Sequence, residues 1–348
     1  MSTEQHRSRG FVLVGVVWFL AVMTLLAAAA VLWVERSVNV MENRRAAMLR
    51  EIEESTLLAR VQWLIATQGY TIAGLTIPSD GVAQAPQLDS SVMPVGGELP
   101  LDGRPLCMAN GWCLGLTDDA ARLSLSAVDP RLLGNLLLGL GVTPEEVPAM
   151  LAQWSDYLMP EGAPRLGSAG GRATWRGGSQ DSRRTPRSVL EVFLLDRWQP
   201  WEEHLLNADW TELVTTSATP LNINTADPRV LNLAWGLPVE QVSRLVAARE
   251  QQSLARSTDL RALLGAHANL VPDDGWTRLA SSTLSIRLHP TGVERATEYE
   301  VSFSSDHRML PPWQLQLKRS VKRNEADSIH ASGDVPGILS APLMAGPW

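Results

Sequence analysis

The chain has 348 residues, of which 45% are hydrophobic and 19% charged, and its formal net charge at pH 7 is −7. That composition excludes a disordered polymer. A sequence pI near 5.5 excludes a chain-wide electrostatic nucleic-acid binder, whose binding domain would have a pI above about 9. Two cysteines, Cys107 and Cys113, and six histidines are too few for a zinc ribbon or a multi-disulfide scaffold.

The N-terminal segment is a polar leader followed by an apolar run. Residues 1–10 carry Arg7 and Arg9, and residues 11–34 contain no charged side chain. Such a run is long enough to span a bilayer and longer than the apolar core of about 7–15 residues in a secretory signal. It predicts one retained membrane helix with its basic end in the cytoplasm and the body in the periplasm. An ordinary signal anchor is the alternative interpretation.

The same helix is expected to continue beyond the membrane and to end at Gly69, because residues 35–68 contain no glycine or proline. A helix of about 58 residues would be roughly 87 Å long at 1.5 Å per residue. Apolar side chains recur at helical spacing along its second half, and we expect them to form its core face. They are Met41, Met48, Ile52, Ala59, Trp63 and Ala66.

The two cysteines flank a tight-turn signal, Asn110-Gly111. Gly, Pro and Ser are frequent over residues 71–105, which predicts loops with one or two weak strands. An oxidising periplasm favours a disulfide between Cys107 and Cys113. Two unpaired buried thiols are the alternative.

An internal repeat lies in the helical region expected over residues 117–275. Residues 123–133 and 221–231 both contain Asp-Pro-Arg, and both predict a helix start, since proline is tolerated in the first turn and Thr225 or Asp227 can cap the second copy. Two more helices are expected from Pro238 and from Ser257. The first of these has an expected buried stripe of Val239, Val242, Leu245 and Val246.

The second copy is similar to the helix-hairpin-helix modules of DNA-uptake proteins. Phosphate binding by such a hairpin uses backbone N–H groups at a Gly-hydrophobic-Gly turn. The turn here is Gly236-Leu237-Pro238, and proline has no N–H to donate. A structural or subunit-contact role is therefore expected, without nucleic acid as a partner.

Two segments are expected to lack regular structure. Residues 165–187 are rich in arginine and are interpreted as a solvated linker, with docking to an acidic partner or to lipid headgroups as alternatives. Residues 323–348 have no periodicity and are expected to be a disordered tail.

In residues 276–322, apolar and polar side chains alternate with period two. They predict three antiparallel strands with half-buried faces, carrying Leu284, Ile286, Leu288, Tyr299, Val301, Phe303, Leu315 and Leu317.

Several features together resemble the K family of minor pseudopilins of the type II secretion system (general secretion pathway protein K, the GspK family). Gly10 is followed directly by Phe11, as at the site where a prepilin peptidase cleaves, and the helical region contains two Asp-Pro-Arg helix starts. Gly15 stands at the fifth mature position, where most of the superfamily has a glutamate. The resemblance implies removal of residues 1–10 and methylation of the new N-terminus at Phe11.

The resemblance also implies an α+β fold: a pilin-like long N-terminal helix packed on an antiparallel sheet, with a large inserted all-α domain containing helix-hairpin-helix-like repeats. The expected parts are the leader (1–10), the transmembrane helix (11–34), the remaining helix with early strands (35–116), the inserted helical domain (117–275), the C-terminal strands (276–322) and the tail (323–348).

The function implied by the resemblance is to cap the tip of the periplasmic pseudopilus and to initiate its assembly for protein export. The implied partners are minor pseudopilins I and J, the prepilin peptidase, the inner membrane, the exported substrate and the outer-membrane secretin. Gly15, Ile52, Ala59 and Trp63 are the expected assembly residues. A membrane-anchored DNA-uptake receptor is the alternative. An enzyme is not expected, because the Ser, His and carboxylate residues form no nucleophile motif.

Calcium is the only cofactor that the resemblance implies. Family members have a Trp-x-Asp-x-Asp-like segment, and this chain has Trp154, Asp156 and then Leu158 in place of the second carboxylate. Calcium needs six to eight oxygen ligands, so Asp156 is a weak candidate and is interpreted as an ordinary surface carboxylate.

Overall fold

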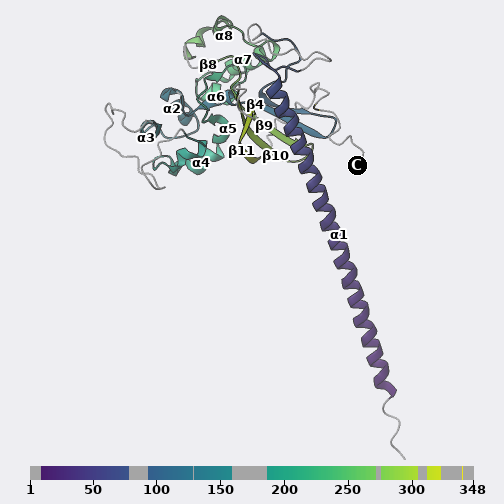
Figure 1. Ribbon diagram of the computed structural model, residues 1–348. Helices are drawn as coiled ribbons and strands as arrows, with labels where there is room; N and C mark the ends of the chain where they lie inside the picture. Colours follow the sequence, from purple (N-terminus) through teal and green to yellow (C-terminus); the bar gives the residue numbers. More distant parts are fainter. Residues whose placement is uncertain are drawn as a thin grey trace, which may run out of the picture. The chain divides into compact units, whose positions relative to one another are not determined.

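The computed structural model describes residues 9–77, 93–127, 129–158, 186–271, 276–304, 312–322 and 339. The chain forms two compact units, Met1–Leu57 and Leu58–Trp348. The boundary falls inside the first helix, α1 (Arg9–Thr67), which has 59 residues and is the long helix of Figure 1. It begins two residues before Phe11 and ends just before Gly69. No glycine or proline follows Gly15 within it, so nothing in its backbone chemistry interrupts it.

The second unit contains a five-stranded antiparallel sheet in the order β11-β10-β9-β4-β3. Its strands are β3 (Asp102–Cys107), β4 (Trp112–Asp118), β9 (Thr283–Pro290), β10 (Arg295–Phe303) and β11 (Trp313–Lys322). Two short strands, β1 (Tyr70–Thr71) and β2 (Gly74–Leu75), form a separate hairpin after α1. The α+β class predicted from the sequence is confirmed.

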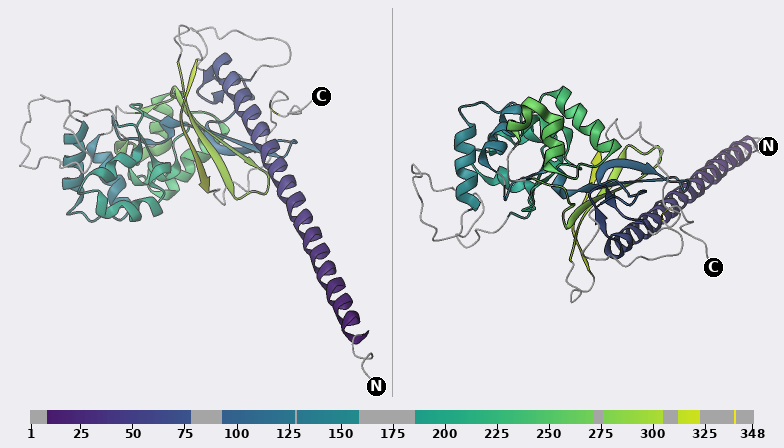
Figure 2. Two further views of the ribbon diagram at one scale, coloured as in Figure 1. Left: turned by 60° about the horizontal axis from the view of Figure 1, so that its bottom comes forward. Right: turned by 90° about the horizontal axis from the view of Figure 1, so that it is seen from above.

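Strands β4 and β9 are neighbours in the sheet, although residues 119–282 separate them in the chain. The helices between them gather on one side of the sheet (Figures 1 and 2). They are α2 (Pro130–Gly139), α3 (Val147–Leu158), α4 (Glu202–Asn207), α5 (Trp210–Leu213), α6 (Pro228–Leu233), α7 (Val239–Gln251) and α8 (Ser257–Leu264). We call residues 119–282 the helical insertion.

Two pairs of short parallel strands and four 3-10 helices complete the helical insertion. The strand pairs are β5 (Leu123–Ser124) with β6 (Val214–Thr215), and β7 (Leu221–Asn222) with β8 (Trp276–Thr277). The 3-10 helices are η1 (Asp119–Ala121), η2 (Val189–Leu194), η3 (Gln199–Trp201) and η4 (Gly265–Leu270). Because β8 pairs with β7, residues 276–277 lie with the insertion. The sequence had placed them with the C-terminal strands.

The two sequence repeats have the same local structure. Each runs from a short strand through a turn to an aspartate that caps a helix. The Asp129 side chain accepts a hydrogen bond from the backbone N–H of Arg131 at 2.8 Å, and Asp227 accepts one from Arg229 at 2.7 Å. Such caps satisfy the exposed donors of a helix start, and the cap of the second copy is therefore Asp227. The Asn135 amide donates to the carbonyl of Ala234 at 3.1 Å and so links the two copies.

The helical insertion has its own core, which is rich in aromatic side chains. Trp154 stacks on Tyr157 with ring centroids 5.1 Å apart, and Trp198 lies between Trp154 and Trp210 at 6.3 and 5.7 Å. Each indole N–H has a carbonyl acceptor within the insertion: Leu125 for Trp154, Met150 for Trp198 and Val189 for Trp210. Burying large apolar rings with their polar atoms satisfied stabilises a core at little polar cost.

The predicted stripe of α7 is wrong at its first member. Val242 and Leu245 are buried, but Val239 is 64% exposed. Val239 is the first residue of α7, and the fully buried Leu237 just before it fills the core at this end of the helix.

Strand β10 has the half-buried pattern that the sequence predicted, but the other two C-terminal strands differ from it. Strand β9 lies in the middle of the sheet, and its side chains are buried on both faces. Leu284 and Ile286 are buried on one face and Ser285 on the other. Strand β11 is an edge strand, and its Leu315 and Leu317 are 52% and 44% exposed. Period-two alternation has the same appearance at the centre and at the edge of a sheet, so it could not distinguish the two.

The face of the sheet that carries Glu298 holds a buried network of charges. Glu298 is 3% exposed, and its two oxygens lie 2.6 Å from guanidinium nitrogens of Arg287 and Arg319. Both arginines also reach Glu212 of α5, at 2.8 and 3.2 Å, and Arg122 lies 3.6 Å from Glu298. Burial alone would raise the pKa of Glu298, but the three guanidinium groups lower it to about 2. The network joins strands β9, β10 and β11 to the helical insertion.

Asp118 ties both ends of the helical insertion together. It ends β4, and its Oδ1 accepts hydrogen bonds from the backbone N–H and the hydroxyl of Ser281, at 2.9 and 2.8 Å, just before β9. Its Oδ2 accepts from the Asn222 amide at 2.8 Å and the Thr225 hydroxyl at 3.1 Å, both in the second repeat. Burial raises the pKa of Asp118, and hydrogen bonds from Asn222, Ser281 and Ala120 act in the opposite direction.

Candidate functional site

Alpha helix α1 is long and apolar enough to cross a membrane. Side chains of its first part are exposed although they are apolar, among them Leu13, Trp18, Phe19, Leu25, Leu32 and Trp33. Exposed apolar side chains over this length are the pattern of a helix whose surroundings are lipid or other helices. Gly15 has no heavy atom within 4 Å of the position that a β-carbon would occupy. Gly10 and Phe11 both lie within α1, and cleavage between them stays a prediction.

The apolar stripe expected to be the core face of α1 is wrong as a core prediction. Met41, Met48, Ile52 and Trp63 are 73%, 64%, 38% and 46% exposed, and Ala59 and Ala66 are exposed as well. We call these six residues the outward face.

The buried side of α1 is a different set of residues. In its last turns, which belong to the same compact unit as the sheet, Val61, Leu64 and Ile65 are at most 4% exposed. At about 100° per residue, these three point about 175° away from Ala59, Trp63 and Ala66. The last turns of α1 are therefore apolar on two opposite sides. One side is buried in the chain's own core, and the other is left exposed.

Three of the four predicted assembly residues lie on the exposed side of α1. Ile52, Ala59 and Trp63 all lie on the outward face, and Gly15 lies in the apolar run near the start of α1. Sequence periodicity had found these residues but had given them to the core. The residues that do form the core, Val61, Leu64 and Ile65, have the same spacing, so the pattern alone could not tell the two sides apart.

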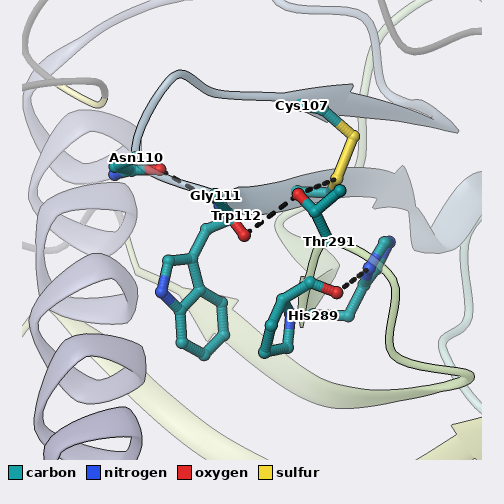
Figure 3. The surroundings of a disulfide bond; sticks show 8 residues. Cys107, Asn110, Gly111, Trp112, His289 and Thr291 are labelled. Atoms are coloured by element: carbon teal, nitrogen blue, oxygen red, sulfur yellow. Dashed lines mark hydrogen bonds between the residues drawn. A yellow bond between two sulfur atoms is a disulfide. The ribbon is translucent and has the colours of Figure 1, made fainter.

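Cys107 and Cys113 form a disulfide across the β3–β4 hairpin, where they are direct strand partners. The predicted Asn110-Gly111 turn closes this hairpin: the N–H of Gly111 donates to Met108, and the Asn110 side chain accepts from Trp112. Thr291 adds two hydrogen bonds to the carbonyl of Gly111, from its N–H and its hydroxyl, at 2.8 and 3.0 Å (Figure 3). The hairpin is thus fixed to the β9–β10 turn as well as by the covalent bond.

The second helical hairpin is poorly suited to bind phosphate. The turn N–H of Leu237 already donates to the carbonyl of Leu231 at 3.3 Å, and Pro238 has no N–H. Arg249, a nearby cation on α7, is directed inward, where it donates to the carbonyls of Ile223 and Ala226 at 3.1 and 2.8 Å. Burial lowers the pKa of Arg249. The N–H of Leu237 and the guanidinium of Arg249 are therefore used within the chain, and Pro238 offers no donor to a DNA backbone.

The first repeat contains a Gly-hydrophobic-Gly turn that the sequence reasoning missed, Gly139-Leu140-Gly141. Its donors are also used within the chain, since the N–H groups of Leu140 and Gly141 donate to Leu136 and Leu138. His204 of α4 covers the turn: its Nε2 lies 2.7 Å from the Leu140 carbonyl oxygen and would lie 3.2 Å from a β-carbon at position 141. Comparing the two repeats position by position would have revealed this turn.

Asp156, the weak calcium candidate, is not gathered with other ligands. In the described part of the chain, no three or more His, Cys, Asp or Glu side chains lie close enough to hold a metal ion. Glu191, a second carboxylate after the first repeat, accepts a hydrogen bond from the Tyr157 hydroxyl at 2.7 Å and from the Arg187 N–H at 2.9 Å. These bonds give that carboxylate a structural role.

Some predictions lie outside the described residues. They concern residues 1–8 of the leader, almost all of the Arg-rich segment 165–187, and the tail 323–348. The exception in the tail is Leu339, which is fully buried.

No family model matches the chain, and no curated protein matches it. Among solved structures, the chain is similar to a chain in the crystal structure of the GspK-GspI-GspJ complex from the type 2 secretion system of enterotoxigenic Escherichia coli. The two chains are 13% identical, and the match covers 83% of this chain and 100% of the other with a TM-score of 0.45.

Proposed function

We propose that this chain is a minor pseudopilin of the type II secretion system, a structural and non-enzymatic subunit. The observation that carries the proposal is the two-sided end of α1: Val61, Leu64 and Ile65 are buried in the body, and Trp63 on the opposite side is 46% exposed. Exposed apolar stripes of this kind mark protein contact sites. A helix that holds its own body on one side and offers an apolar side to neighbours is suited to assembly by helix packing.

The same helix supplies the membrane anchor in this proposal. Its apolar run spans the inner membrane once, with the basic leader in the cytoplasm and the body in the periplasm. Prepilin peptidase then cleaves after Gly10 and leaves Phe11 as the new, methylated N-terminus. A disulfide between Cys107 and Cys113 is compatible with the oxidising periplasm.

A place at the tip of the pseudopilus, where the subunit initiates assembly, is supported by two features. Gly15 supplies no carboxylate to compensate the buried amine of a neighbour, a charge that is costly to leave unpaired in lipid. The helical insertion of residues 119–282 adds bulk between β4 and β9, which would obstruct a further subunit in a tightly stacked fibre. The proposed direct partners are the small minor pseudopilins I and J. The exported substrate and the outer-membrane secretin are further partners that a tip position would bring near.

The processing step is tested by the substitution Gly10→Ala. Mass spectrometry of membrane-extracted protein should show a chain that begins at Phe11 for the wild type and an intact leader for the variant. An intact leader in the wild type, from cells with an active prepilin peptidase, would contradict the proposal.

The assembly step is tested by co-purification with the two small pseudopilins of the same secretion system. The expected result is a stoichiometric complex that Ile52→Asp weakens, because the change places an unpaired charge in an enclosed contact. Leu315→Asp is the matched control, since Leu315 is also a half-exposed apolar side chain (52%) but lies on β11. Homopolymers of the chain alone, or indifference to the small pseudopilins, would count against the tip role.

A further inference from the structure

Two positive charges lie beside the outward face, at the end nearer to the apolar run of α1. Arg44 and Arg45 are exposed, and at about 100° per residue they flank Met48, which is 64% exposed. Met41, about two turns before Met48, and Ile52, about one turn after it, continue the apolar stripe. Among the described residues, neither Arg44 nor Arg45 makes an ion pair or a hydrogen bond. Glu51 follows Arg44 by two turns, roughly 10 Å along the axis, which is too far for a direct ion pair. Glu42 lies about one turn before Arg45, but the described residues include no salt bridge between these two side chains.

Arg50 provides a comparison on the same helix. It has the same charge and is also exposed, but it points about 180° away from the centre of the stripe formed by Met41, Met48 and Ile52. Its Nε donates to the carbonyl of Ala46 at 3.2 Å. The arginines beside the stripe lack such an internal acceptor, so their donors are available to a molecule that covers the stripe.

The backbone of Arg44 lies beyond the lipid headgroup layer. The apolar run ends at Val34, and Arg44 lies ten residues further on, about 15 Å along the helix. The headgroup layer adds only about 5–8 Å to each side of the hydrocarbon core. A tilt of about 40°, the upper end of the observed range, still leaves Arg44 about 11 Å from the core. Arg36 is the residue at headgroup level.

We propose that residues 41–52 of α1 bind a helix of another chain that has an apolar ridge and, level with Met48, an aspartate or glutamate that pairs with Arg44 and Arg45. Guanidinium groups hold carboxylates in fixed, often bidentate geometry. An ion pair at the edge of an apolar contact sets the register of two helices and rejects partners with the wrong charge. The inference rests on the proposed function, because it gives the chemistry of the partner at the same outward face.

The test uses the full chain, co-expressed with the two small pseudopilins of its secretion system, solubilised in detergent and captured by an affinity tag. Reversing both charges (R44E with R45E) should lower the captured pseudopilin more than about tenfold, because like charges would then face each other. The matched control R50E should stay within about twofold of the wild type. The conservative pair R44K with R45K should retain most of the binding, and raising the salt concentration should weaken wild-type capture.

A photo-reactive side chain at Met48 identifies the occupant directly. The expected product is a crosslink to a small pseudopilin at a helical segment with an aspartate or glutamate within one turn. The same group at Asn43, on the far side of the helix, should give no such product. Crosslinks from position 48 only to lipid, or only to a second copy of this chain, would overturn the inference.

The outcomes separate the two proposals. If the wild type captures the small pseudopilins and the double reversal captures them equally well, the partner carboxylate is refuted and the proposed function stands. If the wild type captures neither small pseudopilin, the proposed function fails and this inference fails with it.

Discussion

The body of the molecule and its N-terminal helix differ in whether particular charged and apolar side chains are buried or exposed. In the body, the charges of Glu298, Arg287 and Arg319 are buried and satisfied by one another. On α1, the charges of Arg44 and Arg45 and the apolar side chains beside them are left exposed. This contrast underlies our proposal that the body is complete as a single chain, whereas the helix is completed by other molecules.

The largest loss of stability is expected when Glu298, the centre of the buried network, is removed. Glu298→Ala leaves Arg122, Arg287 and Arg319 without their shared carboxylate, and breaking a buried pair in this way costs about 3–5 kcal/mol. Denaturant titration of the detergent-solubilised chain, followed by tryptophan fluorescence, should show that loss. The control is Arg197→Ala, which removes a surface pair of 3.9 Å with Glu146 and should cost less than about 1 kcal/mol. Equal effects would mean that the network contributes nothing beyond a surface pair.

The buried side of α1 should respond next most strongly. Leu64 is fully buried, and Leu64→Ala is expected to lower the free energy of unfolding by about 2–5 kcal/mol through lost burial and the cavity that remains. The same denaturant titration measures it. A loss below about 1 kcal/mol would show that the end of α1 is not part of the core.

Low pH should lower the stability of the body, because the carboxylate of Glu298 becomes protonated. The folded-state pKa of Glu298 is about 2, below the ordinary value of 4.5, so its ionised form is stabilised by folding. This contribution, on the order of 3 kcal/mol, is fully present above pH 4.5 and is lost as the pH falls toward 2. In Glu298→Gln that part of the pH dependence should disappear. An unchanged slope between pH 4.5 and 2 would contradict the assignment.

The disulfide should contribute a smaller amount. Replacing Cys107 and Cys113 together by serine opens a short loop, with a sequence separation of 6, and the chain-entropy relation gives about 2 kcal/mol for such a loop. Thermal unfolding of the variant and of the wild type with reductant should agree. If reductant leaves the wild type unchanged while the variant is destabilised, the effect belongs to the serines and not to the lost bond.

Local signals in the sequence predicted the parts of this fold that local chemistry determines. The absence of glycine and proline predicted α1, the Asp-Pro-Arg repeats predicted two capped helices, and Asn110-Gly111 predicted the hairpin that the disulfide closes. These features depend on residues within a few positions of each other. Local spacing also identified Ile52 and Trp63 as members of one apolar stripe, and their role in assembly stays a prediction.

The parts that could not be predicted depend on partners far apart in the chain. Arg319 meets Glu212 across 107 residues, and Asp118 meets Ser281 across 163, so no spacing rule could pair them. Helical periodicity found an apolar side of α1 but could not choose between two such sides, because both have the same period. Only the folding of the body, in which Val61 and Leu64 are fully buried, decides which side is the core.

The last prediction concerns the side of α1 that the core does not use. Trp63 neighbours Leu64 in sequence, but it is 46% exposed, so Trp63→Ala should change the free energy of unfolding by no more than about 0.5 kcal/mol. Truncating a tryptophan at the centre of a protein contact typically costs about 2 kcal/mol or more, so capture of the small pseudopilins should fall by about thirtyfold. Leu64→Ala, measured in parallel, should show the reverse: reduced stability, with binding per folded molecule retained. If both variants lose stability alike, Trp63 belongs to the core of the body, and the contrast between a complete body and an incomplete helix is lost.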